Sequence, residues 1–496
     1  MKEDFENFER RFKERLHTLF YNEGNINSLS LERGLPGNIW EGIMETIPLS
    51  VAIPEKFGGR GLSVKECLSV LSAASYESLP LSLTFGINIA LFLEPLAKYG
   101  HPKIQERIFK RFLKEKAMGG LMITEPDYGS DALNMRTSFN SREDGFAING
   151  KKHWQGLTGM ADFWIVAARE QLKDGDLGRD IAFFITEQSS PGQQIEVEYY
   201  FNNLGLYMIP YGMNAIDIFV PENQKLQSES TGIKMMLDIL HRSRMQFPGM
   251  GLGFIRRMLD EALAYCNQRK VAGQSLFFLD SVKYQLSRIE SSYAICSGMC
   301  ARSAVISSIN ADLSSCGLEA NIMKALVTDL MQESSQIALQ LQGSSGYKID
   351  NIAGRGIVDS RPFQIFEGSN EMLYTQIAEI MIKKMKKMQQ ETFFQFLSGF
   401  PLTEKIAGQF KELLDFSIKD TLLQRQLITL GKIIARVVSL QYVYNMTLKG
   451  FRNDLYDNCC KHMMMDIKSL LSNLTDFNNS MPVEDYTSQS AWSDFI

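Results

Sequence analysis

A single carboxylate, Glu367, is the strongest candidate for chemistry. It lies in the segment Ile365-Phe366-Glu367-Gly368-Ser369-Asn370-Glu371, at a glycine turn just before a predicted helix. A carboxyl group among apolar neighbours loses solvation, which raises its pKa toward the range that suits a base. Judged alone, the segment is more typical of a solvated turn residue. The interpretation of Glu367 as a catalytic base therefore depends on the motifs found elsewhere in the chain.

Composition narrows the kinds of partner to expect. The chain has 496 residues, of which 45% are hydrophobic and 22% charged, with a formal net charge of −5 and a sequence pI of about 5.8. Since no basic footprint is present, nucleic acid is not expected as a partner, and small-molecule chemistry is favoured. The seven cysteines form no paired CxxC motif, which indicates a reduced, intracellular setting and predicts no metal site.

The N-terminal segment indicates a cytoplasmic protein. MKEDFENFERRFKERLHTLF mixes acidic and basic residues, unlike a secretory signal or an organelle transit peptide, and is expected to be a helix of the folded protein. The most apolar early run, residues 81–93, is interrupted by Ser82, Thr84 and Asn88. It stops at Glu94, well short of the ~20 apolar residues that a membrane span requires. No transmembrane helix is predicted.

Changes in hydrophobic period divide the chain into four parts. The predicted fold class is α+β and mainly helical. An N-terminal helical domain (1–118) precedes a middle β-barrel or sandwich (119–230), a C-terminal four-helix bundle (231–385) and an additional helical extension (386–496). A polar tail is predicted from Asn478 onward.

Two local signals refine this division. In the middle domain, residues 145–148 and 151–154 flank Asn149-Gly150, which is the strongest short-range signal for a hairpin turn. In the bundle, glycine and serine clusters predict breaks at 344–346 and around 354–356.

The order of helices, β domain and helix bundle, together with the local motifs, resembles the acyl-CoA dehydrogenase family over about residues 30–385. Residues 53–62 are similar to the entry loop of the family. The segment Thr124-Glu125-Pro126-Asp127-Tyr128-Gly129-Ser130-Asp131 is much more specific. Its spacing from Trp154, Arg269 and Glu367 makes the resemblance strong. The family binds FAD and removes two hydrogens from the α and β carbons of an acyl thioester.

The resemblance implies roles for residues around the substrate. It assigns Glu367 as the base that takes the α proton while flavin N5 takes the β hydride. The backbone N–H of Glu367 and a ribityl hydroxyl would hold the thioester carbonyl where enolate charge develops. Arg244 carries over near the substrate pocket and the CoA arm. Gly368, a second substrate-binding residue, would allow close approach of the backbone to the flavin.

Four residues carry over as FAD contacts. The Thr124 hydroxyl would meet the ring edge, the Ser130 hydroxyl the pyrophosphate, and the Trp154 indole would pack against the flavin. Ser369 stands where the family usually has a threonine that touches the cofactor. Outside this family, the two loop hydroxyls are typical of turns and caps, and a strand tryptophan is typical of a core.

Three further residues imply a second subunit. Arg269 resembles the residue whose guanidinium reaches the pyrophosphate of a neighbouring subunit's FAD. Gln340 and Gly343 resemble the loop that meets the adenosine half of FAD across the interface. The resemblance therefore implies a homodimer or homotetramer.

Several positions depart from the family pattern. Gly156 replaces a threonine that hydrogen-bonds near flavin N5, Ala272 replaces a common phenylalanine, and Ser344 replaces the second glycine of the adenosine loop. His241 takes a position where an aspartate often meets CoA. These departures favour weaker FAD binding and leave an acyl carrier protein as an alternative to CoA.

The favoured function is FAD-dependent conversion of an acyl-CoA to a trans-2-enoyl-CoA in fatty acid metabolism, with an electron-transferring flavoprotein or equivalent acceptor. The alternatives are a dehydrogenase for carrier-protein substrates, an O₂-using oxidase of the same fold, and a non-catalytic scaffold that has lost cofactor contacts. The extension resembles that of very-long-chain family members, where it accompanies dimers and membrane association. Apolar stripes at helical spacing are more often core, so we expect the extension to pack on the bundle.

Overall fold

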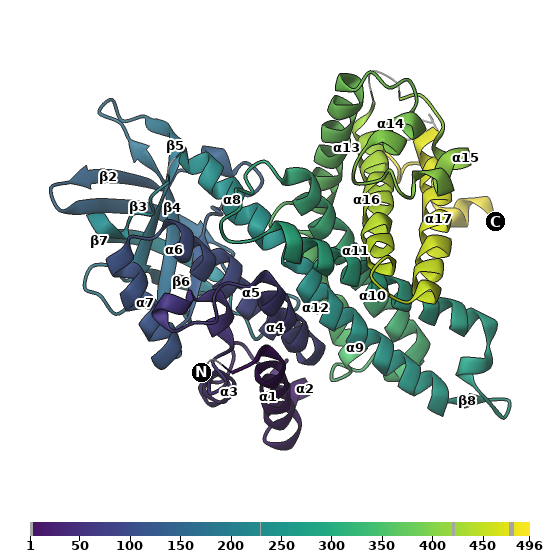
Figure 1. The fold of residues 1–496 in the computed structure, drawn as a ribbon, viewed down its shortest axis with the longest axis horizontal. Helices are drawn as coiled ribbons and strands as arrows, with labels where there is room; N and C mark the ends of the chain where they lie inside the picture. The colour runs from purple at the N-terminus through teal and green to yellow at the C-terminus, as the bar shows by residue number, and fades with distance from the viewer. Residues whose placement is uncertain (1–2, 229, 419–421, 476–480) are drawn as a thin grey trace.

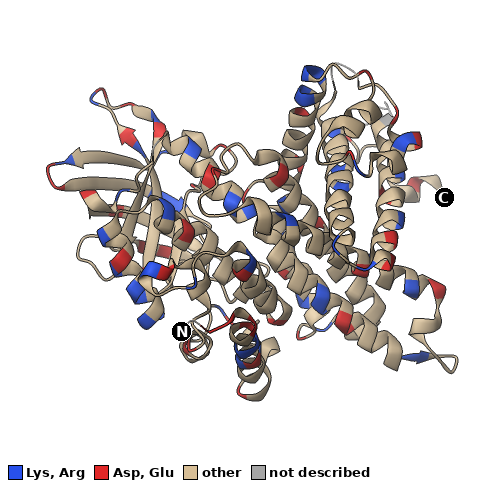
Figure 2. Ribbon diagram, in the orientation of Figure 1, with Lys and Arg blue, Asp and Glu red and all other residues tan. Residues whose placement is uncertain are grey.

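A computed structural model describes residues 3–228, 230–418, 422–475 and 481–496. The mainly helical α+β fold class is confirmed, with helices first, a sheet in the middle and helices to the end. Figure 1 places the sheet at one end of the molecule and the C-terminal helices at the other. Acidic and basic residues are intermingled over all of these elements in Figure 2. The predicted start of the polar tail, Asn478, lies outside the described residues.

The N-terminal part is built from amphipathic helices. In α1 the buried side chains Phe8, Phe12 and Leu16 recur every four residues, which places them on one face of the helix. Asp4 caps α1 by accepting a hydrogen bond from the Asn7 N–H. The helices are α1 (Phe5–His17), α2 (Ile26–Leu29), α3 (Gly37–Met44), α4 (Val64–Glu77), α5 (Leu79–Asn88), α6 (Glu94–Tyr99) and α7 (Pro102–Lys114).

Among the described residues, two stretches of helix are long and apolar enough to cross a membrane. They are Leu79–Tyr99, which comprises α5, a π-helical turn and α6, and α16 (Gln424–Thr447). In the first, 94% of the apolar window is buried inside the fold, and in the second 67%. Packing against other elements of the protein therefore accounts for the apolar character of both.

The middle part is a seven-stranded sheet in the order β1-β4-β2-β3-β7-β6, with β5 paired to β4. Strands β1 and β2 run parallel to β4, and the other pairs are antiparallel. The strands are β1 (Gly119–Met122), β2 (Ser138–Arg142), β3 (Gly145–His153), β4 (Phe163–Gln171), β5 (Leu177–Glu187), β6 (Glu196–Tyr200) and β7 (Gly212–Pro221).

The hairpin predicted at Asn149-Gly150 is wrong. Strand β3 runs unbroken through both residues, and the turn lies earlier, between β2 and β3. Asn149 pairs with Ser138 on one side and with Asp217 on the other. Because both edges of β3 are paired, sheet formation outweighs the local turn preference. Gly150 is required for another reason, since a Cβ there would collide with Thr137.

The C-terminal bundle contains α8 (Gly232–Arg244), α9 (Phe247–Gln268), α10 (Asp280–Ile306), α11 (Gly317–Gln342), α12 (Ile352–Ser360) and α13 (Asn370–Lys387), with a small hairpin of β8 (Lys270–Val271) and β9 (Gln274–Ser275). The break predicted around 354–356 is wrong, because α12 spans it. A Cβ on Gly356 would lie 3.1 Å from Phe254 Cζ, and one on Gly354 would lie 2.5 Å from the Gly346 carbonyl oxygen. These glycines permit close packing and do not end the helix.

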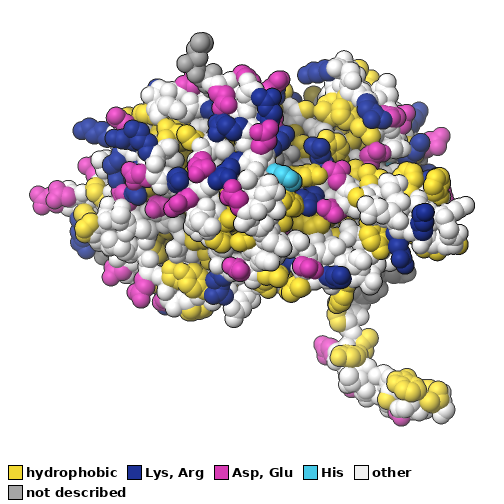
Figure 3. Space-filling model, turned by 90° about the horizontal axis from the view of Figure 1, so that it is seen from below, with side chains coloured by type: hydrophobic (Ala, Val, Ile, Leu, Met, Phe, Trp, Pro, Cys, Tyr) yellow, Lys and Arg dark blue, Asp and Glu magenta, His cyan; other side chains and the backbone are white. Residues whose placement is uncertain are grey.

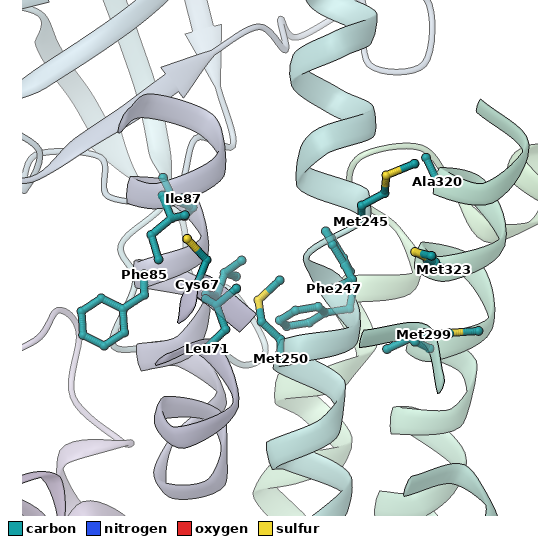
Figure 4. Close-up of a cluster of buried hydrophobic side chains, with 14 of the residues drawn as sticks. Cys67, Leu71, Phe85, Ile87, Met245, Phe247, Met250, Met299, Ala320 and Met323 are labelled. Carbon is teal, nitrogen blue, oxygen red and sulfur yellow. The ribbon is translucent and has the colours of Figure 1, made fainter. Parts of the chain in front are cut away.

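A methionine-rich core joins the N-terminal helices to the bundle. In Figure 4, Leu71 faces Met250 of α9, the Phe85 ring points away from Met250, and Met245 lies beside α11 at Met323. All five side chains are buried. This packing fixes the short break between α8 and α9, where the functional site is found.

The expectation that the extension packs on the bundle is confirmed. Asp466 on α17 accepts hydrogen bonds from Arg288 of α10 at 2.9 Å and from Arg436 of α16 at 3.1 Å. The Tyr442 hydroxyl donates to Glu319 of α11 at 2.7 Å. Figure 1 shows the two long helices standing beside α10 and α13. The helices of the extension are α14 (Phe393–Gly399), α15 (Lys411–Leu414), α16 (Gln424–Thr447) and α17 (Asn453–Thr475).

Candidate functional site

Glu367 lies in the turn before α13 with its carboxyl group buried. Its Oε1 accepts a hydrogen bond from Ser243 Oγ at 2.8 Å. Its Oε2 is buried and has no partner among the described residues. Burial raises the pKa of Glu367, and Arg244, Ser243 and Lys324 offset only part of this effect. A buried carboxylate with one free oxygen and a raised pKa has the properties of a general base.

The backbone of this turn is strained. The φ angle of Glu367 is +52°, in the left-handed region that residues with a Cβ rarely adopt, and that of Gly368 is +91°. Such a conformation costs of order 1–3 kcal/mol and persists only where the surroundings fix it. Two cations provide this restraint. Arg244 Nε donates to the carbonyl oxygen of Glu367 at 3.0 Å, and Lys324 Nζ donates to that of Gly368 at 2.7 Å.

The turn leaves backbone donors free. The N–H groups of Glu367, Gly368 and Ser369 have no acceptor within the described part of the chain. Ser369 is the N-cap of α13, and its hydroxyl makes no capping hydrogen bond. Unpaired N–H groups at the positive end of a helix dipole can stabilise an oxygen that gains negative charge. The base and these donors therefore belong to one turn.

The loop that carries Thr124 is held by a buried ion pair. Lys152 on β3 is completely buried and donates to Glu125 at 2.9 Å. Glu125 also accepts from the N–H groups of Arg136 and Thr137 at 2.6 and 2.9 Å. Burial lowers the pKa of Lys152 to about 8, although Glu125 acts in the opposite direction. The sequence analysis missed this pair, because a lysine on a strand normally points to solvent.

The structure brings Thr124 and Trp154 together. The carbonyl oxygen of Thr124 accepts from the N–H of His153 at 3.0 Å and from Gln155 Nε2 at 3.1 Å, so the residues on both sides of Trp154 are tied to it. The Trp154 side chain is 50% exposed, and its ring lies 4.4 Å from the Phe201 ring. An exposed indole beside a second aromatic ring offers a stacking surface for a flat ligand.

The residues present fit FAD. Besides the exposed indole, the hydroxyls of Thr124, Ser130 and Ser369 form no hydrogen bond to protein in the described ranges, so all three are available to a ligand.

Neighbouring side chains occupy the space beside Gly156, where the family has a threonine. A Cβ on Gly156 would lie 2.7 Å from Ile87 Cδ1 and 3.2 Å from Ile209 Cγ2. Apolar side chains from α5 and from the loop before β7 therefore occupy the space that a threonine side chain would need.

Three predicted cofactor residues lie away from this cluster. Arg269 precedes β8, and Figure 1 places β8 at the opposite end of the molecule from the sheet. Gln340 and Gly343, at the end of α11, are exposed like Arg269. Within one chain these residues do not join Trp154, which agrees with an interaction between subunits.

His241 makes its contact inside the fold. Its ring is buried and Nδ1 lies 2.7 Å from the carbonyl oxygen of Leu313, in the loop between α10 and α11. The altered recognition of the CoA end that this histidine indicates stays a prediction.

The described residues contain no group of three or more His, Cys, Asp or Glu side chains placed to hold a metal ion. The surface viewed in Figure 3 mixes hydrophobic and charged side chains over the body of the molecule.

The chain matches the family models for the N-terminal, middle and C-terminal domains of acyl-CoA dehydrogenases over residues 9–116, 120–217 and 230–382. An acyl-CoA dehydrogenase of Bacillus subtilis (strain 168) is 25% identical over 340 residues, which are 67% of this chain and 86% of the relative.

Two solved structures illustrate the fold. An acyl-CoA dehydrogenase from Bacillus anthracis complexed with FAD is 16% identical with a TM-score of 0.75, and the match covers 97% of this chain and 90% of that one. The prolyl acyl carrier protein oxidase AnaB is 19% identical with a TM-score of 0.68, covering 77% and 99%. The longer match to the Bacillus anthracis structure extends over most of the added helices.

Proposed function

Because this chain belongs to the acyl-CoA dehydrogenase family, we propose that it oxidises the α–β bond of an acyl thioester with Glu367 as the base for the α proton. The family makes it an FAD-dependent oxidoreductase that acts on CH–CH groups. Bound FAD supplies the acceptor for the β hydride. Residues of this chain orient the thioester and accept the α proton.

The geometry of the Glu367 carboxyl group carries this proposal. Ser243 fixes Oε1, so Oε2 is the oxygen that is free to take a proton from carbon. As the proton leaves, negative charge grows on the thioester oxygen. The unpaired N–H groups of Glu367 and Gly368 are available to stabilise this charge. Position 368 favours glycine, because its φ is +91° and a Cβ there would lie 2.9 Å from Met372 Cε and 3.1 Å from Leu373 Cδ2.

Arg244 supports the reaction indirectly. Its Nε donates to the carbonyl oxygen of Glu367 and its Nη1 to Asn321 Oδ1 at 2.8 Å. These contacts direct the guanidinium toward the turn. We therefore assign Arg244 to holding the substrate-side backbone, and its place near the substrate pocket and the CoA arm stays part of the proposal.

The FAD site is proposed to contain Thr124, Ser130, Trp154 and Ser369 of one subunit. Arg269, Gln340 and Gly343 of a second subunit would complete it, because all three are exposed and Arg269 precedes β8, at the opposite end of the molecule from the sheet. The proposal therefore includes a homodimer as the smallest active unit.

The proposal also includes a cytoplasmic location and an electron-transferring flavoprotein or equivalent acceptor. The leading substrate class is fatty acyl-CoA, and membrane association through the extension is not favoured.

A carrier-protein substrate is the second candidate. It is favoured by the buried position of His241, which leaves the usual aspartate contact to CoA unreplaced, and by the fold shared with a prolyl acyl carrier protein oxidase. An oxidase that passes electrons to O₂ would use the same base. The non-catalytic scaffold is disfavoured by the intact surroundings of Glu367.

The test is anaerobic bleaching of the flavin by a panel of acyl-CoAs and acyl carrier proteins. Wild-type protein should be bleached, and Glu367→Gln should bind FAD but lose about 10²–10⁴-fold in bleaching rate. Glu371→Gln, an exposed carboxylate four residues later, is the matched control and should behave as wild type. A Glu367→Gln variant with the wild-type rate would refute the base assignment. A protein that refuses FAD would support the scaffold.

A further inference from the structure

Lys324 is a buried lysine beneath the Glu367 turn, and the proposed reaction gives it no role beyond its hydrogen bond to Gly368. It lies on α11 with its side chain completely buried. Its ammonium group donates to the carbonyl oxygen of Gly368 at 2.7 Å and to Asn370 Oδ1 at 2.9 Å. Both partners are uncharged. Burying an ammonium group with uncharged partners costs folding free energy. A lysine is therefore expected at such a position only where it has a function.

The first consequence of this contact is geometric. In a planar trans peptide, the C=O of one residue and the N–H of the next point in opposite directions. Lys324 holds the Gly368 carbonyl and so aims the Ser369 N–H away from α11. Arg244 holds the Glu367 carbonyl and so aims the Gly368 N–H in the same manner. The two basic side chains hold one side of the turn, and the free N–H groups of Gly368 and Ser369 point to the other side.

Asn370 makes this restraint rigid. Its Nδ2 donates to Thr328 Oγ1 at 2.9 Å and to Asp329 Oδ1 at 2.7 Å, both on α11. The Tyr374 hydroxyl, one turn along α13, donates to the other oxygen of Asp329 at 2.7 Å. Lys324 is therefore the end of a network that locks the start of α13 against α11. The turn cannot move without breaking several buried hydrogen bonds.

The second consequence is electrostatic. The charged groups that face Lys324 are Glu367 in the turn, Arg244 on α8 and Asp329 on its own helix. Burial lowers the pKa of Lys324 to about 7, with Arg244 acting in the same direction and the two carboxylates opposing it. In return, the positive charge of Lys324 lowers the pKa of Glu367 and favours its ionised form.

We propose that Lys324 is a positioning residue for the oxidation: it fixes the Glu367–Ser369 turn through the Gly368 carbonyl, and in its protonated form it favours the ionised form of Glu367. The inference rests on the function proposed above, because it concerns the same base. It predicts that both the orientation of the turn and the proton affinity of Glu367 change together when Lys324 is replaced.

The test compares Lys324→Met, Lys324→Gln and wild type. The carboxylate of Glu367 is titrated by difference infrared spectroscopy against Glu367→Gln in the same background, a measurement that needs no turnover. Lys324→Met should move this titration to higher pH by about one unit and slow flavin bleaching about 10–100-fold. Lys324→Gln should show the same titration shift but lose less rate, because it keeps a donor toward Gly368. Lys98→Met, which removes a lysine paired with Asp238, is the control and should leave the titration unchanged.

The outcomes separate the two proposals. If Glu367 titrates at the wild-type pH in both Lys324 variants, the positioning role is wrong even though acyl thioesters are oxidised. If the titration shifts but no acyl thioester bleaches wild-type protein, the Lys324 contact is confirmed and the proposed function fails. Should Lys324→Met not fold, Lys324→Gln carries the test with the same expected shift.

Discussion

Replacing Ser243 by alanine tests the electrostatics of the base most directly. The Ser243 hydroxyl is the single donor to the Glu367 carboxyl group in the described structure, and it lies 2.8 Å from Oε1. A hydrogen bond to a charged group contributes about 1.5–3 kcal/mol. Since 1.36 kcal/mol corresponds to one pKa unit, its loss should raise the pKa of Glu367 by about 1–2 units. The sign follows because the hydroxyl stabilises the ionised form.

The assay is the rate of anaerobic flavin bleaching between about pH 5 and pH 9 with saturating acyl thioester. The acidic limb of the profile, where Glu367 becomes protonated, should move upward by about 1–2 pH units in Ser243→Ala. Below both pKa values the variant should be about 10–100-fold slower than wild type at the same pH. Ser439→Ala on α16 removes another buried hydroxyl, which bonds only to its own helix, and should leave the limb in place.

Unfolding offers a check without substrate. Burial already raises the pKa of folded Glu367 above its ordinary value of 4.5. Such a group stabilises the fold most at low pH, and this stability is lost as the pH rises through the folded pKa. Ser243→Ala should extend the loss to higher pH. An acidic limb and a stability profile that both match wild type would refute the assigned hydrogen bond and its influence on the base.

Two further predictions concern buried ion pairs. Lys152→Met should lower the unfolding free energy by about 3–5 kcal/mol and weaken FAD binding, because it leaves Glu125 buried without its cation. Adding Glu125→Gln to Lys152→Met should restore much of this stability. Denaturant unfolding measures the stability and FAD titration measures the binding. A Lys152→Met variant as stable as wild type would contradict the pairing. Asp466→Asn should cost about 2 kcal/mol, since the carboxylate holds Arg288 of the bundle and Arg436 but keeps some exposure. Chemical unfolding that is unaffected by Asp466→Asn would show that the extension is not anchored at this point.

The sequence was sufficient for the order of domains, because hydrophobic period is a local signal. The burial of Glu367 agrees with the role that the family resemblance implied, whereas its local segment alone favoured a solvated turn residue. The sequence was insufficient where distant segments decide. Asn149 and Gly150 formed the strongest hairpin signal in the chain, yet pairing on both edges of β3 made them part of a strand. The sequence also could not show that Ile87, about 70 residues earlier in the chain, occupies the space that a threonine at position 156 would need. Lys324 gave no signal at all, since a lysine on a helix is usually solvated.

The departures from the family pattern bear on whether the chain is still an enzyme. A protein that had lost catalysis would have no reason to keep a costly arrangement around its former base. Here Glu367 retains a left-handed backbone, a buried oxygen without a partner, and two buried cations on its carbonyl side. Each of these features costs stability, and such costs are typical of functional sites. The substitution at Gly156 is filled by neighbouring side chains and leaves no cavity for a threonine. The residues around the site therefore fit one another despite the substitution. This favours a changed substrate or cofactor contact over loss of activity.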